Sequence, residues 1–265
     1  MRRFVLVPWT ALVAAFLIGP IVLLLPLSLN PRSLGAWPET LSTVWYRRVL
    51  TDEGWTRAFG DSVLIALVSA VIATAVGLAA AFAIVRGTWR WKSVATLIVL
   101  MPMILPVVAT AESIYFLFVD LGLDGTVLGI GLGQAVLALP TAVIVLTATL
   151  GEFDHRLELA AMSLGASRPR AIARVTLPMI WPGVAAGFAF AFLTSFDELI
   201  VALFLSSPTL QTLPVKVWAA LEFELDPSVA AVSVLIVGLV MVMWLVAQLV
   251  RAGVGRGRIQ RKTEN

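Results

Sequence analysis

The chain has 265 residues, of which 60% are hydrophobic and only 13% charged, and its formal net charge is +3. A soluble domain carries about 25% charged residues, so this composition cannot cover a water-exposed surface of this size. The mean hydropathy of +0.97 agrees, and the absence of cysteine excludes disulfides and thiolate metal sites. We therefore expect an all-α, polytopic membrane protein with one transmembrane domain over residues 1–265.

Six apolar stretches are long enough to cross a hydrocarbon core of about 30 Å as helices. The fold class predicted from them is a bundle of six transmembrane helices. In chain order the stretches run from about Phe4 to Leu29, Ser62 to Val85, Val94 to Val119, Thr126 to Leu150, Met179 to Leu205, and Val229 to Val250.

The first stretch follows Arg2 and Arg3, an arrangement also found at the start of secretory and twin-arginine signals. Its apolar part is longer than a signal core of about 7–15 residues, and no clean small-residue cleavage pattern follows it. We therefore expect an uncleaved first membrane helix.

The basic residues predict the orientation of the chain, because Lys and Arg are retained in cytoplasmic loops. With both termini in the cytoplasm, only five of the 19 basic residues lie outside, namely Arg32, Arg47, Arg48, Arg57 and Lys216. The basic character is thus a topology signal, and we expect no nucleic-acid partner. The inside residues are Arg2, Arg3, Arg86, Arg90, Lys92, Arg156, Arg168, Arg170, Arg174, Arg251, Arg256, Arg258, Arg261 and Lys262.

The most polar inside segment, here named the polar loop, covers about residues 151–177 between the fourth and fifth spans. Apolar residues recur at helical spacing up to Leu164, and Gly165 is placed to end that helix in the left-handed conformation. Ser167 then stands at the start of a second short helix, with Pro169 in its first turn. The loop is therefore predicted to be two short helices joined by a glycine turn.

The same loop resembles a family signature. Glu158-Leu159-Ala160-Ala161, Gly165 and Val175-Thr176-Leu177-Pro178 are similar to the EAA signature of ABC-importer permeases. That signature reads Glu-Ala-Ala, three residues, Gly, nine residues, then Ile-x-Leu-Pro. The chain departs from it at Leu159, which occupies the Glu position, while Glu158 is adjacent.

The resemblance implies a type I ABC-importer permease fold in a bacterial inner membrane. It also implies three partners besides lipid: a cytosolic ATPase dimer, a second permease chain in a heterodimer, and a periplasmic solute-binding protein. In the family this loop is the coupling helix that docks on the ATPase. The alternative is a surface helix that only links two spans. The residues to which the docking role carries over are Glu158, Leu159, Ala160, Ala161, Gly165, Ala166 and Ser167.

No enzyme activity is expected in this chain. The only histidine, His155, has no second metal ligand nearby, and neither a phosphate-binding loop nor a nucleophile–base pair is present. We therefore expect no metal site and no cofactor here, with ATP and Mg²⁺ bound by the partner ATPase. The two alternative classes are an ion-coupled secondary transporter and a membrane-embedded enzyme. The sequence shows no internal repeat that would favour the first and no catalytic cluster that would favour the second.

Ser195-Phe196-Asp197-Glu198 and Thr212-Leu213-Pro214-Val215-Lys216-Val217-Trp218 are similar to the spermidine/putrescine permease branch of the family. The resemblance implies a polyamine substrate. Related permeases carry ferric iron, sulfate or other small solutes, so another small solute, such as a cationic or amino-acid-like compound, is the alternative.

Carboxylates inside membrane spans are costly and mark pathways or partners. Glu112 and Asp197 each lie 19 residues into their spans, which is about 28 Å along a continuous helix. With Glu198 they would form an acidic site or outer gate for a cation, lined by Tyr115 and Phe196. The alternative is that all three lie in the outer interface, exposed to water.

Pro102 and Pro106 stand four residues apart in the third span. Proline breaks the helical hydrogen-bond ladder and kinks helices. A hinge in a gated pathway and an ordinary packing irregularity both fit this pair.

Overall fold

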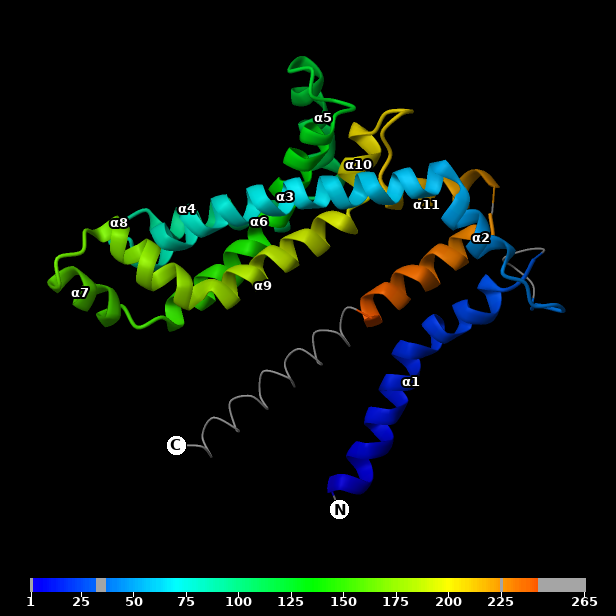
Figure 1. Ribbon diagram of the computed structural model, residues 1–265, viewed down its shortest axis with the longest axis horizontal. Coiled ribbons are helices and arrows are strands. Elements are labelled where there is room, and N and C mark those ends of the chain that lie inside the picture. The colour runs from blue at the N-terminus through cyan, green and yellow to red at the C-terminus, as the bar shows by residue number, and fades with distance from the viewer. Residues whose placement is uncertain (1, 32–36, 225, 243–265) are drawn as a thin grey trace, which may run out of the picture. The chain divides into compact units, whose positions relative to one another are not determined.

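The computed structural model describes residues 2–31, 37–224 and 226–242 (Figure 1). These residues form helices, and the only β-structure among them is an isolated bridge between Ser207 and Leu210. This confirms the predicted all-α class. The chain divides into two compact units, one of residues 1–56 with 217–265 and the other of residues 57–216. They are called unit 1 and unit 2 below.

Four helical segments in the described part of the chain are long and apolar enough to cross a membrane: Leu6–Ser28, Glu53–Arg86, Val127–Glu152 and Arg168–Phe196. They match the first, second and fourth predicted spans. The fifth predicted span, Met179 to Leu205, is matched only as far as Phe196, and its last residues form the separate helix α10 (Ile200–Leu205). The sixth predicted span is described only as the helix Ser228–Val242. Its remaining residues, and the basic C-terminal residues beyond it, lie outside the described part.

The third predicted span is broken. It consists of α4 (Lys92–Leu100), the 3₁₀ turn η1 (Met101–Met103) and α5 (Val107–Asp120). The two halves, Lys92–Met103 and Val107–Asp120, are bent by 96°. The bend lies at Pro102 and Pro106, where the helix ladder cannot continue. The assumption of a continuous helix up to Glu112 is therefore wrong, and so is the depth derived from it.

Unit 1 contains α1 (Arg2–Ser28), α2 (Val44–Thr51) and the start of α3 (Glu53–Arg86). The Ser28 hydroxyl is 2.6 Å from the Tyr46 hydroxyl, and Trp45 Nε1 donates to the Asn30 carbonyl at 2.8 Å. These bonds hold α2 to the end of α1. At the other chain end, the π-helical turn η3 (Ala220–Glu224) follows α11 (Leu213–Ala219) and leads towards Ser228–Val242.

The core of unit 2 is formed by α3, α6 (Val127–Glu152) and α9 (Leu177–Phe196), which run side by side (Figure 1). Small side chains let these helices approach closely, as is common between membrane helices. At Gly183 of α9, a Cβ atom would come within 2.2 Å of the Thr149 side chain on α6. The buried core residues are Ala70, Ala73, Ala81, Ala135, Ala138, Ala142, Leu146, Leu150, Ile180 and Ala191.

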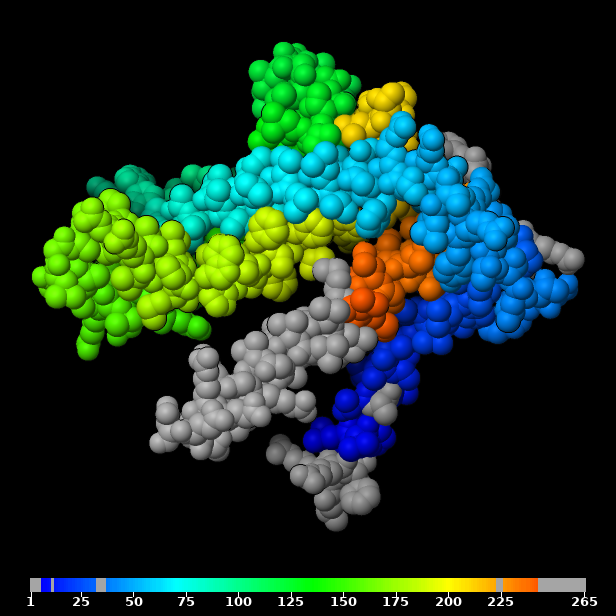
Figure 2. Space-filling view, viewed as in Figure 1, coloured from blue at the N-terminus to red at the C-terminus, as the bar shows by residue number. Residues whose placement is uncertain are grey.

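A second cluster in unit 2 surrounds α10 (Ile200–Leu205), which packs against α5 and α6. Val201, Ala202 and Leu205 are fully buried there. Outside the cores, α3 carries exposed apolar side chains, and the space-filling view shows that one side of this helix is not covered by the rest of unit 2 (Figure 2). Such a surface suits lipid contact. Its exposed large residues in unit 2 are Phe59, Leu64, Leu67, Val71 and Val76.

Candidate functional site

The polar loop folds as the sequence predicts. α7 (Arg156–Ser163) is followed by a turn and then by α8 (Arg168–Ala171). Gly165 has a φ of +93°, and the amides of Gly165 and Ala166 donate to the carbonyls of Met162 and Ala161. This pairing is a Schellman ending, which requires a residue in the left-handed region. Ser167 occupies the N-cap position of α8, but its side chain makes no capping hydrogen bond.

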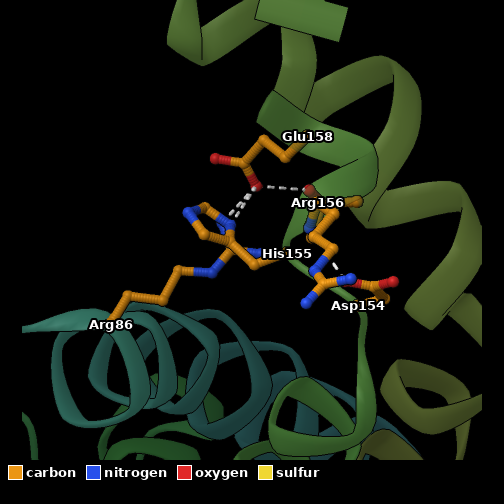
Figure 3. Close-up of polar contacts among 6 residues, drawn as sticks. Arg86, Asp154, His155, Arg156 and Glu158 are labelled. Atoms are coloured by element: carbon orange, nitrogen blue, oxygen red, sulfur yellow. Dashed lines mark hydrogen bonds and ion pairs between the residues drawn. The ribbon is translucent and has the colours of Figure 1, made fainter. Parts of the chain in front are cut away.

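The Glu158 carboxylate is the centre of a polar cluster beneath α7, here named the anchor cluster (Figure 3). One nitrogen of Arg86, the last residue of α3, donates to Glu158 Oε2, and the Thr176 hydroxyl donates to the same oxygen at 2.8 Å. His155 Nδ1 lies 3.8 Å from it. The Glu158 side chain is 0% exposed and that of Arg86 is 11% exposed. The carboxylate therefore faces the interior of unit 2, away from the outer surface of the loop.

The anchor cluster changes the proton affinity of Glu158. Burial by itself raises the pKa of this carboxyl group. Hydrogen bonds from Thr176 and Arg86, with the positive charges of Arg86 and of His155 when protonated, outweigh burial and hold the pKa below its ordinary value of 4.5. Glu158 is therefore ionised at neutral pH and forms a true ion pair with Arg86.

Apolar side chains are exposed on the outer side of the polar loop, beside polar ones such as Arg156 and Ser163. Leu159, which stands where the family has Glu, is 50% exposed, and Leu164 is 90% exposed. Leu157, Ala160 and Met162 are also exposed on α7, and Gly165 is exposed in the turn that follows it. Ala161 and Ala166 are half-buried, and Ser167 is exposed. The loop thus combines a buried charge on its inner side with exposed apolar side chains on its outer side.

Among the predicted pathway acids, Glu198 is used by the fold itself. Its carboxylate accepts hydrogen bonds from the amides of Ile200, Val201 and Ala202, at 2.8, 3.0 and 3.2 Å. These are free amides of the first turn of α10, which a carboxylate stabilises. Behind it, Gln134 Nε2 donates to the Glu198 carbonyl at 3.4 Å. The carboxylate of Glu198 therefore serves as a helix cap in this structure.

Glu112 and Asp197 are both exposed, and neither forms an ion pair with another described residue. The predicted aromatic residues belong to different packing groups. Tyr115 lies against Phe204 of α10 with ring centroids 6.3 Å apart, whereas Phe196 stacks on Phe192 of α9 at 5.9 Å. The predicted gathering of acids and aromatic rings around one site stays a prediction.

Several residues of these clusters are not visible as partners in the sequence. In the sequence, Arg86 is only one of the basic residues that predict the orientation of the chain, and its partner Glu158 lies 72 positions later. Gln134 and Ser195 read as isolated polar residues, but Ser195 donates to Gln134 at 2.6 Å within the buried interface of α6 and α9. A buried polar residue in an apolar span was the one available signal, since such groups need partners.

Two relatives with known names cover almost the whole chain. The putrescine transport system permease protein PotI of Escherichia coli K12 is 31% identical over 264 residues, 96% of this chain and 94% of the relative. The spermidine/putrescine transport system permease protein PotC of the same organism is 29% identical over 236 residues and covers 89% of both chains. Both are permease subunits of transport systems by their names.

The fold matches a solved structure, that of a bacterial ABC transporter involved in the import of the acidic polysaccharide alginate. The TM-score is 0.72 over 93% of this chain and 96% of the other, at 19% identity. The family of binding-protein-dependent transport system inner membrane components matches residues 73–253, more than half of the chain. The chain is a multi-pass membrane protein that belongs to this family of ABC-importer permeases.

Proposed function

We propose that this chain is a transmembrane permease subunit of an ABC importer that moves polyamines such as putrescine and spermidine across the inner membrane. The observation that carries the proposal is the similarity over nearly the full chain to permeases named for these two solutes. The exposed carboxylates of Glu112 and Asp197 support it, because a polyamine is a chain of ammonium groups.

The proposed assembly contains a second permease chain, a cytosolic ATPase dimer and a periplasmic binding protein, with both termini of this chain in the cytoplasm. ATP and Mg²⁺ are bound by the ATPase. The exposed apolar side chains of α7 and of its C-cap residue, Leu159 and Leu164 among them, form the part of the polar loop that contacts the ATPase. Transport then proceeds by alternating access as the ATPase pair closes.

The assembly is tested by co-purification. Leu164→Asp places a charge on the outer face of the polar loop and should reduce the recovery of the ATPase with the permease, whereas Leu164→Met should not. If the wild-type chain transports in liposomes without any ATPase, driven only by an ion gradient, the proposal of an ABC-importer subunit is contradicted.

The substrate is tested by uptake of labelled putrescine and spermidine into proteoliposomes that contain the complete importer. Asp197→Asn should lower polyamine uptake about tenfold while the complex stays assembled, because an ammonium group of the polyamine loses an opposite charge. Asp124→Asn, which removes an exposed acid outside the predicted set, is the control. Uptake of a different solute, such as ferric iron, without any polyamine uptake would show that the proposed substrate is wrong. The assignment of the chain as a permease would be unaffected.

A further inference from the structure

The anchor cluster joins three elements through one oxygen atom. Glu158 lies on α7, Arg86 ends α3, and Thr176 precedes α9 directly. Figure 3 shows the Arg86 side chain reaching from its helix towards the Glu158 carboxylate. A displacement of α7 therefore acts on the ends of two long membrane helices at a single point.

Arg86 is also held from the side. Its guanidinium carbon lies 4.9 Å from the ring centroid of Phe82 on α3 and 5.6 Å from that of Phe153. Phe153 is the C-cap residue of α6, so the third long helix of unit 2 also ends beside this guanidinium. Cation–π contacts of this kind strengthen as the cation is desolvated. The ends of α3 and α6 are thereby fixed to the group that binds Glu158.

Thr176 reaches Glu158 from an irregular helix. The residues Ile172–Thr176 form a π-helical turn, η2, between α8 and α9. Such turns are rare and often occur at functional sites. Thr176 is fully buried, and the next residue begins α9, so the position of its hydroxyl and that of the first turn of α9 are tied together.

The cluster is stiff but incompletely paired. Glu158 Oε1 and Arg86 Nη2 are buried without a hydrogen-bond partner among the described residues. The ion pair therefore depends on one nitrogen of Arg86 and one oxygen of Glu158. In this buried environment the contact is strong, and removal of one partner leaves the other as an unpaired buried charge. An ion pair exposed at the protein surface would be solvated and weak, and it would transmit little movement from one helix to another.

We propose that Arg86 and Glu158 are positioning residues that transmit the movement of α7 to α3 and α9, so that the pair sets how much transport each hydrolysed ATP produces. The inference rests on the proposed function, in which α7 contacts the ATPase. It assigns a role to a residue at the end of α3 that lies outside the polar loop.

The test uses the complete importer in proteoliposomes and measures solute moved per ATP hydrolysed. Glu158→Gln and Arg86→Met should lower this ratio about tenfold, the size expected for residues in a coupling network, while the ATPase still co-purifies. Arg86→Lys and the exchanged pair R86E/E158R should recover much of the ratio. Arg90→Met, which removes an exposed charge four residues away, is the matched control and should leave it unchanged.

A second measurement is independent of transport. Because the chain has no cysteine, T88C and S163C allow one spin label beyond α3 and one on α7, both at exposed positions. In the wild type the distance between the labels should have one narrow distribution that keeps its position when ATP binds, because the ion pair moves α7 and the end of α3 together. Glu158→Gln should broaden it, and R86E/E158R should narrow it again.

The outcomes separate the two hypotheses. An unchanged transport-to-ATP ratio and a narrow label distance in Glu158→Gln would overturn the positioning role while leaving the importer intact. A complete importer in which Leu164→Asp still binds the ATPase would instead overturn the proposed contact of α7. If Glu158→Gln cannot be purified, Arg86→Lys and the exchanged pair decide, and failure of the exchange to recover coupling counts against the inference.

Discussion

At the residue scale, the most informative side chain is Glu158. Its neighbour Leu159 occupies the signature position usually held by Glu, and the two side chains divide the roles. Leu159 is half exposed on the outer face of α7, whereas Glu158 is buried against Arg86 and Thr176. A charged residue next to the usual position is thus used inside the subunit, and an apolar side chain is exposed at the usual position.

The lowered pKa of Glu158 predicts a dependence of stability on pH. A carboxyl group whose pKa falls on folding contributes stability that is fully present above its unfolded pKa and lost as the pH falls through the folded value. Glu158→Gln should therefore destabilise the protein at pH 7, by about 3 kcal/mol because the Arg86 charge is left unpaired. The difference from wild type should shrink as the pH falls below 4.5, the ordinary value for this group.

The measurement is the thermal unfolding midpoint of the two proteins in detergent between pH 7 and pH 3. Glu152→Gln, which changes an exposed carboxylate in the same loop, is the control and should follow the wild type. A constant difference between wild type and Glu158→Gln across this range would contradict the ionised pair.

At the element scale, hydrophobic pattern predicts the location of most helices but not their breaks. Long apolar stretches gave the spans because a helix needs about 20 such residues to cross the bilayer. Pro102 and Pro106 indicated a kink, yet the 96° bend depends on how α4 and α5 each pack. The break before α10, whose amides the Glu198 carboxylate caps, is likewise hidden in the sequence, because the stretch is apolar on both sides of it.

The glycine turn between α7 and α8 was predictable because its requirement is local. Gly165→Ala should destabilise this turn by about 1 kcal/mol, because a side chain is strained at positive φ. No atom lies within 4 Å of the added Cβ, so the cost is backbone strain alone. Faster hydrogen exchange of the amides in α7 would report it.

Gly151→Ala is the control for this change, since its added Cβ also meets no atom within 4 Å and its φ is not positive. Equal exchange in the two variants would show that the left-handed turn contributes nothing to the stability of the polar loop.

At the scale of the whole molecule, charge distribution predicts what the fold by itself does not, namely which side of the membrane each loop faces. The pattern of basic residues predicts a cytoplasmic position for residues 87–92 and 151–177. The structure agrees that the two segments lie at the same end of unit 2, since Arg86 and Glu158 meet there. Long-range pairs of this kind could not be predicted, because no local pattern relates positions 72 apart.

This orientation predicts a labelling pattern. In intact cells or spheroplasts, a membrane-impermeant thiol reagent should modify T209C and D124C but not T88C or S163C, because the chain offers no other thiol. All four should react after the membrane is permeabilised, which is the internal control. The reverse pattern would place both termini outside and the polar loop out of reach of a cytosolic ATPase.

The separation of Arg86 from Glu158 also has a consequence for biosynthesis. Arg86 is made and reaches the membrane before α4, α5 and α6, whereas its partner follows all three. The ion pair can therefore form only after the whole of α6 and the start of α7 have been made. A chain that ends before Glu158 leaves Arg86 without this partner.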